Sequence, residues 1–309
     1  MGILSPKEFV GDAAAMGRAW GLGESLKYTR ALATAHYENF NVVSFLLPGE
    51  LHQDFYNVYA FCRWADDLGD EMGDTGESLR LLEWWRGELE LMYAGKVAHP
   101  VFVALQGTVE KHGIPERPFA DLLRAFVRDQ TVTRYRNWAE VDEYCVYSAN
   151  PVGHLVLYLC GYGDAERRRL SDATCTGLQL ANFWQDVIVD LEKDRVYLPL
   201  DLLAKYGYSE AELFARKFDA RFGALMAEAV ERARGFFRTG YPLARRVNRR
   251  LSIDLELFSR GGMCILDKIE QQGFDVLSRR PKVGKVDRVR LLAGALVSAM
   301  FPAKSSGAV

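Results

Sequence analysis

The chain has 309 residues, of which 49% are hydrophobic and 26% charged, so it is long enough to bury a sizeable core and typical of a soluble globular protein. The formal net charge of −2 gives no reason to expect nucleic acid as a partner. No apolar run reaches the length of a membrane span, and residues 1–10 lack the pattern of a signal peptide. The five scattered cysteines indicate free thiols in a reducing compartment, so we expect a cytoplasmic protein.

The first half of the chain predicts a series of helices. Ser5 and Glu8 form the pattern of a capping box with Pro6 at the first helical position, so a helix begins there and ends before Gly21 and Gly23. Further helices are expected at residues 24–36, from Pro48 to residue 73, and at residues 78–94, 101–112 and 119–135.

The second half shows the same periodicity with a few interruptions. Pro151 should break or kink the helical segment at residues 140–160, and Gly240 with Pro242 should interrupt the one at residues 219–250. The other expected elements are a helix at residues 167–194, a short extended segment at 195–199, a capping box from Ser209 to Glu212, a helix at 251–272 bent at Gly261 and Gly262, and a last helix at 286–300. Because no segment alternates long enough for a sheet, we expect one all-α domain spanning residues 1–309.

Two of the expected helices carry columns of oxygen ligands. Asp66 and Asp70 are four residues apart, and Asn182, Asp186 and Asp190 repeat that spacing twice. Residues four apart lie on one face of a helix, one turn from each other. A single pair of this kind is more often a solvated face or an acid paired with arginine.

The neighbours of these acids favour a metal. Both columns stand among apolar residues, which suggests burial, and buried carboxylates need a cation or hydrogen-bond partner. Mg²⁺ takes few carboxylates and keeps positions for water and phosphate oxygens, so two facing columns predict an anionic ligand such as a diphosphate. An apolar and aromatic wall would suit a prenyl chain, although core packing is the simpler explanation of any one aromatic taken alone. The candidates are Phe40, Phe45, Tyr59, Phe61, Tyr144, Tyr147, Phe183 and Trp184.

The motifs together resemble those of the squalene and phytoene synthase family along nearly the whole chain. The similar stretches are His36 with Phe40, Leu46 to Pro48, Tyr59 to Asp70, Tyr144 with Cys145, Pro151 to Gly153, Gln179 to Asp190, and Asp194 to Pro199. The resemblance implies an all-α isoprenoid synthase fold, a single helical domain with a central active-site cavity.

The resemblance also implies roles for individual residues. It implies Asp66, Asp70, Asn182, Asp186 and Asp190 as Mg²⁺ ligands, direct or through water, with Asp66, Asp70, Asp186 and Tyr144 catalytic. The residues implied in substrate binding are Arg63, Arg195 and Tyr197 at the diphosphate, Tyr59 and Gln179 at the cavity, and His36 and Phe40 near the substrate. For His36, a buried histidine at a helix end is an equally good interpretation.

One departure from the family pattern points to a branch. Many members have arginine immediately before the aspartate that Asp186 matches, whereas this chain has Gln185. With residues 38–40 and 147–153, this resembles the bacterial hydroxysqualene synthases of the hopanoid route. That resemblance implies conversion of presqualene diphosphate and water to hydroxysqualene and diphosphate. The sequence does not reveal which residue places the water: Asn39, Tyr147 and Asn150 are candidates, and a structural polar role is the simpler interpretation of each.

Alternatives remain open at this stage. One is head-to-head coupling of farnesyl or geranylgeranyl diphosphate, giving presqualene diphosphate, squalene or phytoene. Another is a non-catalytic prenyl-lipid binding protein. The arginine pairs at residues 249–250 and 279–280 are most simply solvated charge; alternatively they favour peripheral contact with an anionic inner membrane. Neighbouring pathway enzymes are further candidate partners.

Overall fold

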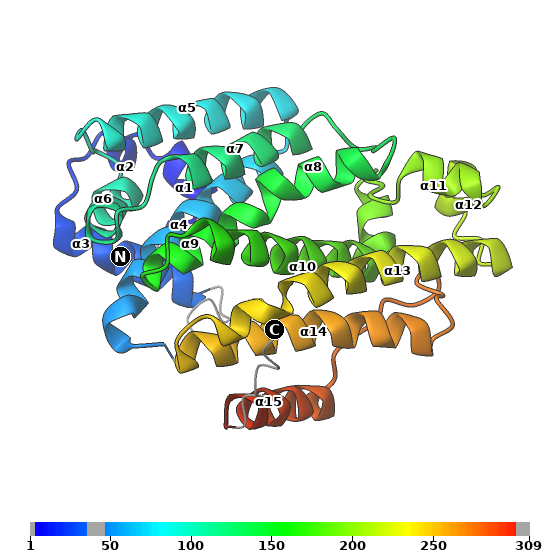
Figure 1. Cartoon of the computed structure of the whole chain (residues 1–309). Coiled ribbons are helices and arrows are strands. Elements are labelled where there is room, and N and C mark those ends of the chain that lie inside the picture. Colours follow the sequence, from blue (N-terminus) through cyan, green and yellow to red (C-terminus); the bar gives the residue numbers. More distant parts are fainter. Residues whose placement is uncertain (1–3, 36–46, 301–309) are drawn as a thin grey trace. The chain divides into compact units, whose positions relative to one another are not determined.

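The computed structural model describes residues 4–35 and 47–300, and within these ranges it is helical, with one isolated β-bridge and no strand (Figure 1). The all-α prediction is therefore confirmed. The helices group into two compact units: unit 1, residues 1–132 with 151–163, and unit 2, residues 133–150 with 164–309. That the chain forms a single domain stays a prediction. In the described part of the chain, none of the helices combines the length and apolar character needed to cross a membrane.

Unit 1 contains eight of the described helices. They are α1 (Pro6–Gly11), α2 (Ala13–Met16), α3 (Leu22–Ala35), α4 (Gly49–Asp70), α5 (Thr75–Tyr93), α6 (Pro100–His112), α7 (Arg117–Asp129) and α9 (Asn150–Leu159), the last of which starts at the boundary residue Asn150. The capping box of α1 is present. The first predicted helix is shorter than expected because Asp12 ends it and caps α2.

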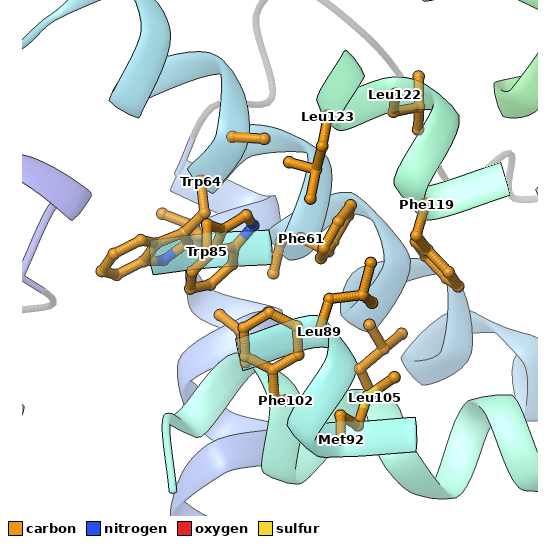
Figure 2. Packing of buried hydrophobic residues seen from close by; sticks show 14 of the residues in the cluster. Phe61, Trp64, Trp85, Leu89, Met92, Phe102, Leu105, Phe119, Leu122 and Leu123 are labelled. Carbon is orange, nitrogen blue, oxygen red and sulfur yellow. The ribbon is translucent and has the colours of Figure 1, made fainter. Parts of the chain in front are cut away.

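The core of unit 1 is built from aromatic rings of four helices. Figure 2 shows Phe61 and Trp64 of α4 against Trp85 of α5 and Phe102 of α6. The two indoles stack with ring centroids 4.9 Å apart, and the ring of Phe61 meets that of Phe119 edge-on at 4.9 Å. These side chains are fully buried, so α4 is fixed along one whole face and the acids on its other face are held in place.

His99 is buried within the same aromatic cluster. Its Nδ1 accepts the backbone N–H of Val101 and caps α6, so the proton of the neutral ring lies on Nε2. The rings of Trp64 and Trp85 stand nearly perpendicular to it, with centroids 4.4 and 4.8 Å away. Burial lowers the pKa of His99 to about 3.

We therefore expect acid to weaken unit 1. The unfolded chain takes up a proton on this histidine near pH 6.5, whereas the folded state takes it up only near pH 3, so stability present above pH 6.5 is lost as the pH falls between these values. Between pH 7 and 5 the loss should be about 2 kcal/mol. His99→Asn keeps a capping acceptor and should remove this loss. The measurement is urea unfolding followed by tryptophan fluorescence; the same acid loss in both proteins would contradict the assignment.

Unit 2 contains the remaining described elements. They are α8 (Trp138–Ser148), α10 (Ala165–Glu192), α11 (Leu200–Lys205), α12 (Glu210–Phe214), α13 (Ala220–Gly240), the 3₁₀-helix η1 (Tyr241–Arg245), α14 (Arg249–Gln271) and α15 (Lys285–Met300). The break near Pro151 is confirmed, since α8 and α9 are separate helices, and η1 interrupts the chain after Gly240 as expected. The short α11 was not predicted.

The structure corrects one expected helix end. The helix expected at residues 119–135 ends at Asp129, because residues 133–136 pair instead with the chain that follows α10, including a bridge between Arg134 and Val196. The helix α14 continues through Gly261 and Gly262, and the bend expected there stays a prediction. Gly262 leaves room for the ring of Phe237, since a Cβ there would lie 2.3 Å from its Cζ.

The long helix α10 is held by α13 and α14, which run beside it in Figure 1. The buried indole of Trp184 donates to the carbonyl of Ala229 at 3.0 Å, joining α10 to α13. The ring of Phe237 lies close to Gly177 of α10 as well as Gly262 of α14, so the three helices meet at one aromatic side chain. This packing fixes the face of α10 opposite its acids.

Candidate functional site

The first acidic column lies on the exposed side of α4. Asp66 and Asp70 are both exposed, whereas Asp67 between them is buried. The expectation that the column itself is buried was therefore wrong: the apolar neighbours form the opposite face of the helix. The spacing argument holds, because both exposed carboxylates stand one turn apart on the same face.

Arg63 binds the acids around this column. Its guanidinium pairs with Asp67, lies 3.3 Å from the Glu71 carboxylate and 3.7 Å from that of Asp66. Burial raises the pKa of Asp67 to about 6, against the opposing effect of Arg63. Asp67 was not singled out from the sequence, although its position four residues after Arg63 on one helix is a signal that could have identified the pair.

The second column lies on α10. Asn182 is exposed, the Asp186 side chain retains 16% of its exposure, and Asp190 is half-buried. Burial, followed by the charge of Asp186, raises the pKa of Asp190 to about 7. Arg280 pairs with Asp186, so it is not simply the solvated surface charge expected from the sequence. Two carboxylates that repel each other in this way form a site where added positive charge is favourable.

The turn after α10 returns Arg195 to the end of the acidic column. Asp194 adopts φ 56°, in the left-handed region, and the Arg195 N–H donates to the Asp190 carbonyl at 2.8 Å. Arg134 holds this turn through both the carbonyl and the carboxylate of Asp194, and it also pairs with Glu210 at 2.6 Å. The role of Arg134 was missed, because these partners lie far from it in the sequence.

A small pocket of about 10 Å³, room for roughly one water molecule, opens beside the column. Asp190, Arg195 and Tyr197 line it together with apolar side chains of α10. The rings of Tyr197 and Phe183 stack with centroids 3.7 Å apart. The ring centroid of Tyr144, on α8, lies 5.8 Å from that of Tyr197. Carboxylate, guanidinium and aromatic side chains thus meet in unit 2. That they form a diphosphate and prenyl site stays a prediction.

The other expected residues lie as follows. Tyr59 is half-buried on α4, and burial raises its pKa. Gln179 is half-buried on α10. His36 and Phe40 lie outside the described residues. The ring of Phe61 belongs to the core of unit 1. The buried ring of Trp184 also lines the small pocket beside the second column, and Asn150 accepts a hydrogen bond from Thr176, a structural contact. That the two columns face each other stays a prediction.

The donor set suits Mg²⁺. Each column offers carboxylate oxygens without sulfur or imidazole, and Asp190 shows the mutual repulsion that a cation would relieve. Within the described ranges, histidine, cysteine and acidic side chains form no group of three or more that could hold a metal. Mg²⁺ binds proteins through one or two carboxylates and completes its shell with water and phosphate oxygens. That Mg²⁺ binds here stays a prediction.

Comparisons with known proteins show the family of the chain. The family model for squalene/phytoene synthase matches residues 33–287. The phytoene synthase of Thermus thermophilus is 34% identical over 275 residues, covering 88% of this chain and 93% of that protein. The phytoene synthase of Arthrospira platensis is 30% identical over 281 residues, covering 84% and 88%.

Solved structures give the same result. The crystal structure of squalene synthase HpnC from Alicyclobacillus acidocaldarius is 42% identical, with a TM-score of 0.78, covering 82% of this chain and 95% of that one. A dehydrosqualene synthase solved with a ligand has a TM-score of 0.80 at 22% identity, covering 90% and 98%, and shows the shared fold. The chain therefore belongs to the squalene/phytoene synthase family of head-to-head prenyl synthases, which act on prenyl diphosphates.

Proposed function

We propose that this chain is a Mg²⁺-dependent hydroxysqualene synthase. It converts presqualene diphosphate and water to hydroxysqualene and diphosphate. The carbon–oxygen bond to the diphosphate breaks, the leaving group keeps the electron pair, and the carbocation rearranges. Water then forms the new carbon–oxygen bond and loses a proton.

The observation that carries the branch assignment is the neutral residue before Asp186. The family resemblance implies arginine at this position in many members, whereas the amide of Gln185 donates to the Pro281 carbonyl at 2.8 Å. In this chain the cation paired with Asp186 is therefore Arg280, from the segment after α14, and not a residue at position 185. The 42% identity with squalene synthase HpnC, above the 34% with the Thermus phytoene synthase, favours a product of the squalene skeleton over phytoene.

The chain's own side chains have separate tasks in this reaction. Asp66, Asp70, Asn182, Asp186 and Asp190 hold Mg²⁺, directly or through water, and Mg²⁺ supplies charge neutralisation to the departing diphosphate. Arg63, Arg195 and Tyr197 bind the diphosphate, and the positive charge that develops is stabilised by aromatic faces such as that of Tyr144.

Head-to-head coupling is the second candidate. The curated relatives at 27–34% identity are named phytoene synthases, and this favours condensation of two prenyl diphosphates. The two candidates differ in substrate: one takes presqualene diphosphate and water, whereas the other takes two molecules of farnesyl or geranylgeranyl diphosphate.

The test is mass spectrometry of lipid extracted after incubating the purified protein with Mg²⁺ and each substrate in ¹⁸O-labelled water. We expect presqualene diphosphate to give a labelled alcohol of the squalene skeleton without NADPH. Farnesyl diphosphate alone should give little product. Efficient conversion of farnesyl diphosphate to presqualene diphosphate, or of geranylgeranyl diphosphate to phytoene, would replace the proposed reaction by the second candidate.

A further inference from the structure

The segment that follows α14 is fixed at two backbone carbonyls. Gly273 and Phe274 take left-handed conformations, with φ of 69° and 65°, and reverse the chain. Val276 and Leu277 then bury their side chains. The Gln272 side-chain amide donates to the carbonyl of Arg279 at 3.1 Å. The chain is therefore anchored immediately before Arg280.

A second glutamine anchors the segment immediately after Arg280. The Gln185 amide of α10 donates to the carbonyl of buried Pro281 at 2.8 Å. Proline has no N–H, so this carbonyl is its only backbone hydrogen-bonding group, and leaving it unmet in a buried place would be unfavourable. Gln185 thus joins this segment to α10 one residue before Asp186.

The anchored segment places the side chain of Arg280 beside the second acidic column. Arg280 Nε pairs with Asp186 Oδ1, 94 residues earlier in the chain, and the two side chains retain 43% and 16% of their exposure. The charge of Asp190, next on the column, also acts on Arg280, and Lys193 and Arg195 in the turn that follows act on Asp190. Arg280 is the group hydrogen-bonded to the Asp186 carboxylate.

We propose that Gln185 is a positioning residue that holds Arg280 on Asp186 as its resident counterion, and that a divalent cation binding Asp186 must displace Arg280. The exchange rests on the proposed function, in which Asp186 is a metal ligand. The positioning of Arg280 by Gln185 does not, since it concerns the metal-free protein. The neutral amide at position 185 then has a structural role: it holds the segment that places the Arg280 guanidinium beside Asp186.

The first test is calorimetric titration of the purified protein with Mg²⁺ alone. Arg280→Gln should bind Mg²⁺ about two- to fivefold more tightly, because a partly exposed ion pair worth up to about 1 kcal/mol no longer competes. Arg279→Gln removes the same charge at the neighbouring exposed position and should change the affinity little. The difference should shrink in about 1 M salt. Equal affinities for wild type and Arg280→Gln would overturn the competition between arginine and metal.

The second test separates positioning from simple hydrogen-bond satisfaction. Gln185→Met keeps the length of the side chain but cannot donate, so it should tighten Mg²⁺ binding in the same direction as Arg280→Gln. In the double variant the two effects should not add, because both act through one ion pair. Additive effects, or no effect of Gln185→Met, would overturn the positioning role.

A third measurement distinguishes failure of this inference from failure of the proposed function. Melting temperatures of the metal-free single and double variants at positions 185 and 280 report their coupling without any metal. Coupled shifts in melting temperature support the positioning role even if none of the proteins binds Mg²⁺. A failure of all the proteins to bind Mg²⁺ would overturn both the exchange and the magnesium assignment. Independent shifts overturn the positioning role whatever the titrations show.

Discussion

Replacing Asp186 by asparagine is expected to lower turnover at least about 100-fold at saturating Mg²⁺. A bound metal that neutralises a leaving diphosphate supplies several kcal/mol to the transition state, and each 1.4 kcal/mol is a factor of ten in rate. The fold should survive, because the side chain lies outside the core of unit 2. Loss of the Arg280 ion pair and relief of repulsion with Asp190 act in opposite directions on stability. Asp66→Asn should also lose turnover by orders of magnitude.

The measurement is steady-state turnover with both presqualene and farnesyl diphosphate, so that the outcome does not depend on the branch. Asp201→Asn on α11 serves as the matched control, since it removes an exposed carboxylate of the same unit outside either column. It should keep wild-type turnover. Wild-type rates for Asp186→Asn and Asp66→Asn would show that neither residue is a metal ligand needed for turnover.

Replacing Gly240 by alanine should destabilise unit 2 by about 3 kcal/mol, near the upper end of the usual effect of overpacking. A Cβ at this position would lie 2.7 Å from the backbone nitrogen of Thr174 and 3.0 Å from the carbonyl oxygen of Leu170. Both atoms belong to the backbone of α10, so the contact cannot be relieved by a change of rotamer. The end of α13 would have to move away from the helix that carries the second column.

Gly235→Ala is the matched control on the same helix. Its Cβ would meet only the Nη2 of the Arg238 side chain, at 3.8 Å. Alanine favours an α-helix over glycine by up to about 1 kcal/mol, so this variant should be as stable as wild type or more stable. The two are compared by chemical denaturation, with the free energy of unfolding taken from transitions of equal slope. If Gly240→Ala were as stable as Gly235→Ala, α13 could move away from α10 without lowering the free energy of unfolding.

The ends of the helices could be predicted from the sequence where the residues that start or stop the helix are close to that end. The capping boxes at Ser5 and Ser209, the stop at Gly113 and the break at Pro151 all depend on residues within one turn. Where a helix end depends on distant partners, prediction failed. The helical pattern ends before residue 130 because residues 133–136 bond to the chain after α10, about 60 residues away.

The candidate site shows the same division. The spacing of the columns was evident because a helix places residues four apart on one face whatever surrounds it. Which face is covered was not evident: apolar neighbours suggested buried acids, whereas the structure exposes Asp66, Asp70 and Asn182 and buries Asp67. Periodicity identifies two faces of a helix, but only packing decides which residues at their border lose contact with water.

The sequence by itself determined the all-α class, the family and the two columns, because these depend on local periodicity and on motifs that can be compared residue by residue. The tertiary structure alone decided which cations from distant parts of the chain meet the acids. Arg134 reaches Asp194 from 60 residues away, and Arg280 reaches Asp186 from 94. Such pairs depend on the left-handed turns at Asp194 and Phe274 and on how the helices pack, and neither is encoded in the spacing of charges along the chain.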